Sequence, residues 1–88
     1  MYSVIFSEES AKQMAKLDNS VSSTIYTWVR KNLDGTTNPR AHGKGLTGNL
    51  KGFWRYRVGK YRLIAEIRDS EIIIEIVNVG HRANVYDS

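Results

Sequence analysis

The basic side chains of this 88-residue chain gather in one stretch of the sequence. No acidic residue occurs between Asp34 and Glu66, and charge alone leaves two interpretations of this interval open: an ordinary solvated surface or a face that binds phosphate. Aromatic residues interleaved with the bases favour the second. The interval contains seven basic residues, Arg40, Lys44, Lys51, Arg55, Arg57, Lys60 and Arg62, together with His42 and the aromatic residues Phe53, Trp54, Tyr56 and Tyr61.

The alternation of side chains along β-strands predicts that three of these arginines lie close together. In a strand over 53–58, Arg55 and Arg57 share one face with Phe53, because successive side chains alternate between the faces. Arg62 takes the matching position in the next strand, and a tight turn at Gly59 brings Arg57 and Arg62 close to each other. Three neighbouring guanidinium groups repel one another, so they require either nearby carboxylates or a polyanion.

The end of the chain adds three groups that suit phosphoryl chemistry, His81, Arg82 and Tyr86. Cleavage of RNA needs a base for the 2′-hydroxyl, cations for the phosphorane and an acid for the leaving oxygen. Arginine binds phosphate in a bidentate manner, histidine can act as acid or base, and tyrosine can orient the hydroxyl or stack on a base. Taken singly, His81 and Tyr86 also fit ordinary structural positions at a strand end and a sheet edge. The set as a whole favours function.

Composition excludes several classes of site. The chain has no cysteine and two histidines, which excludes a disulfide framework, a thiolate nucleophile, a cysteine-based zinc site and a His-rich metal cluster. The N-terminus has no basic segment before Glu8 and Glu9, and no apolar run reaches the roughly 18–20 residues of a membrane span. We therefore expect a single domain over 1–88, without metal or cofactor, in the cytoplasm and not at a membrane.

The first half of the chain predicts one strand and two helices. Tyr2, Val4 and Phe6 alternate as in a strand, and Ser7 can cap the helix that follows. A second helix ends at Asp34-Gly35, and we interpret the stripe that includes Trp28 as core packing and not as a partner surface. The apolar stripes are Ala11, Met14, Ala15 and Leu17 in the first helix, and Val21, Ile25, Trp28 and Val29 in the second.

Residues 36–49 predict a connecting loop that carries Lys44. Gly43, Gly45 and Gly48 are expected to prevent regular structure there. The stretch lacks the Gly-Lys-Ser/Thr of a phosphate-binding loop and does not lie between a strand and a helix, so it predicts no nucleotide site.

The second half of the chain predicts three strands, over 53–58, 60–68 and 71–79, joined by turns at Gly59 and at Asp69-Ser70. The fold class is therefore α+β: an N-terminal strand, a two-helix hairpin and a three-stranded antiparallel meander, with the helices packed on one face of a four-stranded sheet. The last strand is apolar on both faces, so it is expected to be central or covered by a partner. Its faces are Ile72, Ile74 and Ile76 on one side, and Ile73, Val77 and Val79 on the other.

Two segments of the sequence resemble the RelE branch of the RelE/ParE toxin superfamily: residues 52–64 (GFWRYRVGKYRLI) and residues 79–86 (VGHRANVY). The resemblance covers nearly the whole chain. It implies a bacterial or archaeal endoribonuclease that depends on the ribosome, cuts mRNA in the A site and leaves a 2′,3′-cyclic phosphate and a 5′-hydroxyl. It also implies an acidic cognate antitoxin that neutralises the toxin, with operator DNA bound only through their complex.

The resemblance also assigns roles to individual residues. Arg62 and Arg82 match the arginines that stabilise the phosphate, and Tyr86 matches the tyrosine at the 2′-hydroxyl. Arg55 and Arg57 stand where the best-studied branch has a pair of lysines, one of them proposed as general base. Arginine is a poor base, so either another group such as His81 transfers the proton or charge and positioning dominate. The residues expected to bind RNA or the 16S rRNA of the ribosome are Arg40, Lys44, Lys51 and Lys60.

Two other functions remain open from the sequence. A toxin of the ParE branch has the same fold but inhibits DNA gyrase and cleaves no RNA. A toxin that has lost its activity would bind nucleic acid without cleaving it.

Overall fold

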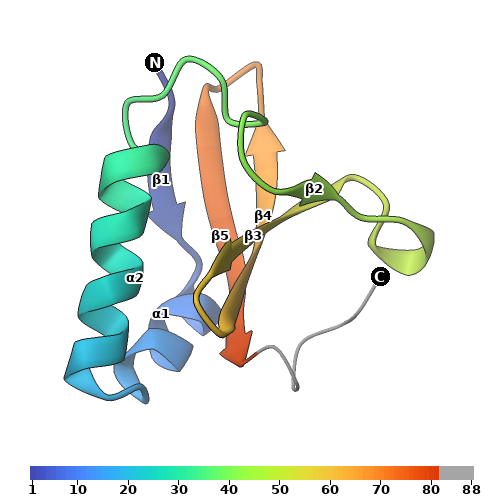
Figure 1. Ribbon diagram of the computed structural model, residues 1–88. Helices are drawn as coiled ribbons and strands as arrows, with labels where there is room; N and C mark the ends of the chain where they lie inside the picture. Colours follow the sequence, from blue (N-terminus) through green and yellow to red (C-terminus); the bar gives the residue numbers. More distant parts are fainter. Residues whose placement is uncertain (82–88) are drawn as a thin grey trace.

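The computed structural model describes residues 1–81, so Arg82 and Tyr86 lie outside the described residues. The chain order is strand, two helices and then the remaining strands, as the α+β prediction has it (Figure 1). The elements are β1 (Ser3–Phe6), α1 (Glu8–Ala15), α2 (Asn19–Asn32), β2 (Lys44–Gly45), the 3-10 helix η1 (Gly48–Leu50), β3 (Phe53–Val58), β4 (Tyr61–Arg68) and β5 (Ile73–His81).

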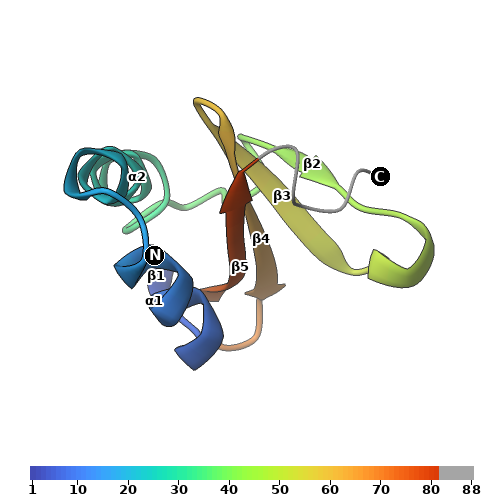
Figure 2. The same cartoon turned by 90° about the horizontal axis from the view of Figure 1, so that it is seen from below.

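The strands form one mixed sheet in the order β1-β5-β4-β3-β2. β1 pairs with β5 in parallel, and the other neighbours are antiparallel. Viewed from below, both helices lie to one side of the strands, and β2 lies at the far edge of the sheet (Figure 2). The interior position of β5 confirms the prediction from its two apolar faces.

The sheet has five strands, and the prediction of four strands was wrong because the 36–49 segment is not only a loop. Lys44 and Gly45 pair with Arg55 and Trp54. Gly43 has a φ of +81°, and a Cβ atom there would overlap the carbonyl oxygen of Arg55 and lie 2.7 Å from Nε1 of Trp54. Glycine therefore allows the backbone to approach β3 closely enough to form a short strand, where we expected it to prevent one.

The main core lies between the helices and the sheet. Its buried residues come from both helices and from β3, β4 and β5, and include Met14, Ile25, Val29, Leu33, Tyr56, Leu63, Ile74 and Ile76. Ser7 caps α1 by accepting a hydrogen bond from the Ser10 amide, as predicted. The predicted stripe of α1 was partly wrong: Ala11 and Ala15 are exposed, and Ser10 is buried because its hydroxyl donates to the carbonyl of Ile76 at 2.7 Å.

A β-bulge changes the pattern of faces in β5. Ile64 pairs with Asn78 and Ala65 with Ile76, so Val77 has no residue opposite it. The extra residue reverses the alternation. Val79 therefore joins Ile74 and Ile76 in the main core, and its predicted place beside Val77 was wrong. Ile72 precedes the strand and is 47% exposed, contrary to its predicted place on the buried face.

In the part of the chain that the structure describes, none of the helices has the length and apolar character needed to cross a membrane.

Candidate nucleic-acid interface

The β3–β4 hairpin places the three predicted arginines on the sheet face that points away from the helices. Arg57 lies directly opposite Arg62, and Arg55 lies between Lys44 of β2 and Ile64 of β4. Cross-strand partners share a face, so these four basic side chains form one group, which we call the arginine face. The predicted approach of Arg57 to Arg62 is confirmed.

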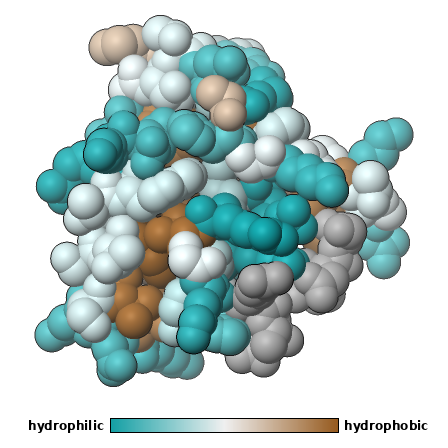
Figure 3. All heavy atoms as spheres, in the orientation of Figure 1, coloured by the Kyte–Doolittle hydropathy of each residue, from teal (hydrophilic) through white to brown (hydrophobic). Residues whose placement is uncertain are grey.

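The members of the arginine face differ in burial. Arg55 is 9% exposed and Arg62 is 5% exposed, whereas Arg57 and Lys44 reach solvent. Among residues 1–81, no carboxylate lies within ion-pair distance of Lys44 or Arg57. Figure 3 shows hydrophilic side chains over the region of β2 and β3, beside an apolar area between α2 and the β3–β4 hairpin. The exposed cations are therefore available to an anion from solution.

The same face is acidic at its other end. Arg68 of β4 forms ion pairs with Glu66 and Glu75, and a longer one of 3.6 Å with Glu71. These carboxylates hold the pKa of Arg68 above its usual value, and the hydrogen bond to Glu66 is the largest cause. Three carboxylates around one guanidinium leave a local excess of negative charge. The sheet face that points away from the helices is therefore basic at the end near Arg62 and Gly80, and acidic at the end near Arg68 and Ile73.

An open hollow lies where α2, the 36–43 loop and β3 meet. Its volume is about 520 Å³, and its lining residues are Trp28, His42, Gly43, Lys44, Arg55 and Arg57. The Trp28 and His42 rings meet edge to face with centroids 5.7 Å apart. Two aromatic rings and three cations therefore border one space.

Sequence reasoning assigned Trp28 to the core alone. Its ring packs against the core and contacts Tyr56 with centroids 5.8 Å apart, which confirms the core interpretation. It also borders the hollow, because the 36–43 loop passes beside α2. Spacing within the helix could not reveal this contact. The available sequence signal was a histidine in a Gly-rich loop next to the basic block.

Three interactions hold the loop that forms one wall of the hollow. The Tyr56 hydroxyl donates a buried hydrogen bond of 2.6 Å to the carbonyl of Pro39. Burial raises the pKa of Tyr56, which keeps this hydroxyl protonated and able to donate. Nε1 of Trp54 donates to the carbonyl of His42 at 2.7 Å. The third is the close approach of the Gly43 backbone to Arg55.

Of the four residues predicted to bind RNA or the ribosome, Lys44 alone lines this hollow. Arg40 forms a bidentate ion pair with Asp69, at 3.0 Å for both bonds, and lies over the Trp54 ring at 5.9 Å. The Tyr2 hydroxyl donates to the same carboxylate at 2.6 Å. Arg40 therefore ties the loop to the β4–β5 turn. Lys51 and Lys60 are exposed, after η1 and in the β3–β4 turn respectively.

The structure does not bring His81 to the same face as the arginines. His81 pairs with Tyr61, and their rings meet edge to face with centroids 5.4 Å apart. Gly80 is the residue opposite Arg62. Successive residues of a strand point to opposite faces of the sheet, so His81 points to the face opposite that of Gly80 and Arg62. Its ring therefore lies on the helix-facing side. The roles predicted for Arg82 and Tyr86 concern positions outside the described residues.

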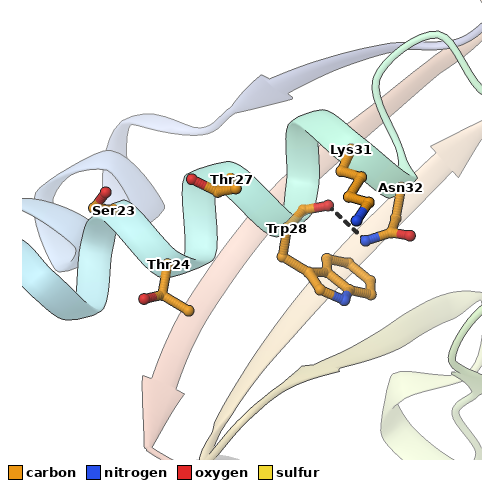
Figure 4. A pocket seen from close by; sticks show the side chains of 6 residues that line it. All are labelled: Ser23, Thr24, Thr27, Trp28, Lys31 and Asn32. Atoms are coloured by element: carbon orange, nitrogen blue, oxygen red, sulfur yellow. Dashed lines mark hydrogen bonds between the residues drawn. The ribbon is translucent and has the colours of Figure 1, made fainter.

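A second hollow, of about 430 Å³, lies along α2 (Figure 4). Its lining residues are Ser23, Thr24, Thr27, Trp28, Lys31 and Asn32, and the Asn32 amide donates to the carbonyl of Trp28 at 3.0 Å. Trp28 thus borders both hollows. Over residues 1–81, the His, Asp and Glu side chains form no group of three or more that could hold a metal ion.

Comparison with known proteins identifies the family. The profile described as the ParE toxin of the parDE type II toxin–antitoxin system matches residues 4–86. The chain belongs to this family. It is 30% identical over 88 residues to a RelE-like toxin protein of Escherichia coli, covering 98% of this chain and 90% of the relative. It is 29% identical over 85 residues to toxin RelG of Mycobacterium tuberculosis, covering 97% and 95% respectively.

Solved structures agree with this placement. The toxin–antitoxin complex RelBE2 of Mycobacterium tuberculosis contains a chain with a TM-score of 0.84 and 28% identity, covering 92% of this chain and 98% of that one. The isolated RelE toxin of Escherichia coli has the same fold, with a TM-score of 0.74 and 21% identity, covering 100% of this chain and 88% of that one. The prediction of a RelE/ParE superfamily toxin is confirmed.

Proposed function

We propose that this toxin is an endoribonuclease that cleaves mRNA in the ribosomal A site. The observation that carries the proposal is the arginine face, where Arg57 and Arg62 lie directly opposite each other beside Arg55 and Lys44. Lys44 and Arg57 are exposed, and no carboxylate among residues 1–81 lies within ion-pair distance of either, so this face suits a polyanionic ligand. The relatives named as a RelE-like toxin protein and as toxin RelG support the same assignment.

The reaction requires few protein groups. The 2′-hydroxyl of RNA attacks the neighbouring phosphorus, the bond to the 5′-oxygen breaks, and the products are a 2′,3′-cyclic phosphate and a 5′-hydroxyl. Arginines that stay ionised stabilise the charge on the phosphorane. The family resemblance gives this role to Arg62, which lies directly opposite the exposed Arg57.

The other roles follow the family resemblance. Arg82 supplies a second cation to the phosphate, and Tyr86 orients the 2′-hydroxyl. Arg55 and Arg57 contribute charge and position but are poor bases. His81 is a candidate for proton transfer, and its ring lies on the opposite face of the sheet from Arg62.

The proposed regulator is an acidic antitoxin that covers the arginine face. Similar chains have been solved as toxin–antitoxin complexes, including RelBE2 of Mycobacterium tuberculosis and RelE–RelB of Pyrococcus horikoshii. We place the toxin in the cytoplasm, where ribosomes, mRNA and the antitoxin are present, and operator DNA is bound through the complex alone.

A second candidate function is inhibition of DNA gyrase, which the ParE description of the matching family favours. Expression in a susceptible bacterium, followed by primer extension on abundant mRNAs, separates the candidates. In-frame cuts that require translation support the endoribonuclease. Filamentation and DNA breaks without mRNA cuts support the gyrase inhibitor, and absence of toxicity supports an inactive nucleic-acid-binding protein.

Two matched charge removals sharpen this test. Arg57→Gln should abolish growth arrest, since Arg57 is an exposed member of the arginine face. Arg30→Gln removes the same charge from α2, beside Val4 and Phe6, and should leave toxicity unchanged. Equal toxicity of the two variants at equal expression would refute the role of the arginine face.

A further inference from the structure

We propose that the hollow beside Trp28 receives one unstacked base of the RNA strand while the arginine face holds the adjacent phosphates. This inference rests on the proposed function and names a base-binding site within it. Its lining combines the aromatic rings of Trp28 and His42 with the basic side chains of Lys44, Arg55 and Arg57.

The chemistry of the lining suits a nucleotide. Single-stranded RNA presents a flat aromatic base and a phosphate within each unit, and proteins that bind it combine aromatic side chains with cations. Here the indole of Trp28 and the imidazole of His42 border the same space as three basic side chains. The volume of about 520 Å³ lies within the range of small-ligand sites.

The hollow is held in shape before any ligand arrives. The Tyr56 and Trp54 side chains each hydrogen-bond a carbonyl of the loop, at Pro39 and His42. Gly43 presents no side chain at the point where the loop meets β3. A preformed site loses less conformational entropy on binding, which favours recognition of one base by a small protein.

The position of the hollow links it to the cleavage site. Arg57 borders the hollow and also lies directly opposite Arg62 on β4. An RNA chain that places one phosphate at Arg57 and Arg62 can therefore place a neighbouring base beside Trp28. The base in the hollow would fix the register of the RNA relative to the arginines.

The experiment measures binding of a short fluorescein-labelled single-stranded RNA to the purified protein by anisotropy at low salt. The same RNA is prepared with one abasic ribose, moved through each position in turn. Loss of the recognised base should weaken binding about ten-fold at one position, the usual size of one stacking interaction. His42→Leu should remove this difference between intact and abasic RNA, and His42→Phe should restore it.

Control variants separate the base from the phosphates. Tyr26→Leu removes an exposed aromatic ring elsewhere on α2 and should keep the ten-fold difference. Arg57→Gln should weaken intact and abasic RNA equally. The His42 side chain is exposed, so its variants are expected to fold, and thermal unfolding checks this.

Several results would overturn the proposal. If every abasic RNA binds like the intact one while Arg57→Gln weakens both, the base site is refuted and the phosphate-binding face stands. Equal binding of intact and abasic RNA, together with poly-glutamate binding that His42→Leu weakens, would assign the hollow to an acidic protein segment. Absence of RNA binding also refutes the base site, whereas mRNA cleavage is scored separately in the expression assay.

Discussion

Gly43→Ala tests whether the close approach of the loop to β3 builds the hollow. Gly43 and Gly35 have nearly the same φ, +81° and +84°, but different surroundings. A Cβ atom at Gly43 would overlap the carbonyl of Arg55, whereas one at Gly35 would meet nothing within 4 Å. Gly35→Ala is therefore a matched control that carries the backbone strain without the overlap.

The magnitudes follow from these two effects. Alanine in the left-handed region costs about 1–2 kcal/mol, which both variants share. An extra methyl group in a filled space costs about 1–3 kcal/mol more, and this applies to Gly43→Ala alone. For a domain of this size, 1 kcal/mol shifts Tm by about 4–8 °C. At about 5 °C per kcal/mol, within this range, we expect Tm to fall by about 5–10 °C in Gly35→Ala and by about 10–25 °C in Gly43→Ala.

Thermal unfolding followed by circular dichroism measures both shifts, and the toxicity assay shows whether the loop still functions. Gly43→Ala should also lose toxicity at temperatures where it remains folded, because the displaced loop carries His42 and Lys44 away from Arg55 and Arg57. Gly35→Ala should remain toxic. Equal Tm losses, or full toxicity of folded Gly43→Ala, would refute the reasoning.

Three other predictions follow from single contacts. Tyr56→Phe leaves the buried carbonyl of Pro39 without its donor and should lower the free energy of unfolding by about 1–3 kcal/mol in urea denaturation, whereas Tyr26→Phe should change it little. The pKa of Asp69 is lowered from 3.8 to about 2 by hydrogen bonds from its arginine partner and then from a tyrosine. Its charge therefore stabilises the fold above pH 4 and loses this effect as the pH falls through 2. Asp69→Asn should make unfolding less dependent on pH in this window, and an unchanged dependence contradicts the assignment. His81→Gln should slow single-turnover cleavage by less than about ten-fold, and a loss of 100-fold or more would show that His81 transfers a proton.

The sequence was most informative where local rules act alone. Alternation placed Arg55 and Arg57 on one face because β3 is regular, and the tight turn at Gly59 set Arg57 opposite Arg62. Alternation failed in β5, since a run that is apolar at nearly every position carries no sign of the bulge at Val77. The bulge is a tertiary feature that moves Val79 into the core.

Contacts distant in sequence could not be predicted. The pairing of Lys44 and Gly45 with β3 depends on the approach of the loop to Trp54. Arg40 belongs to the basic block by position, but its partner Asp69 lies 29 residues away along the chain. The hollow could not be predicted from the sequence either, because it combines Trp28 of α2 with the 36–43 loop and β3.

Cleavage of a defined mRNA on purified ribosomes tests the central proposal most directly. The RNA ends are mapped by primer extension and their chemistry by end labelling, for the toxin and for Arg57→Gln. We predict cuts within the A-site codon that require ribosomes, carry a 2′,3′-cyclic phosphate and a 5′-hydroxyl, and disappear with Arg57→Gln. Intact mRNA on ribosomes with the toxin present, together with inhibition of purified gyrase, would contradict the account.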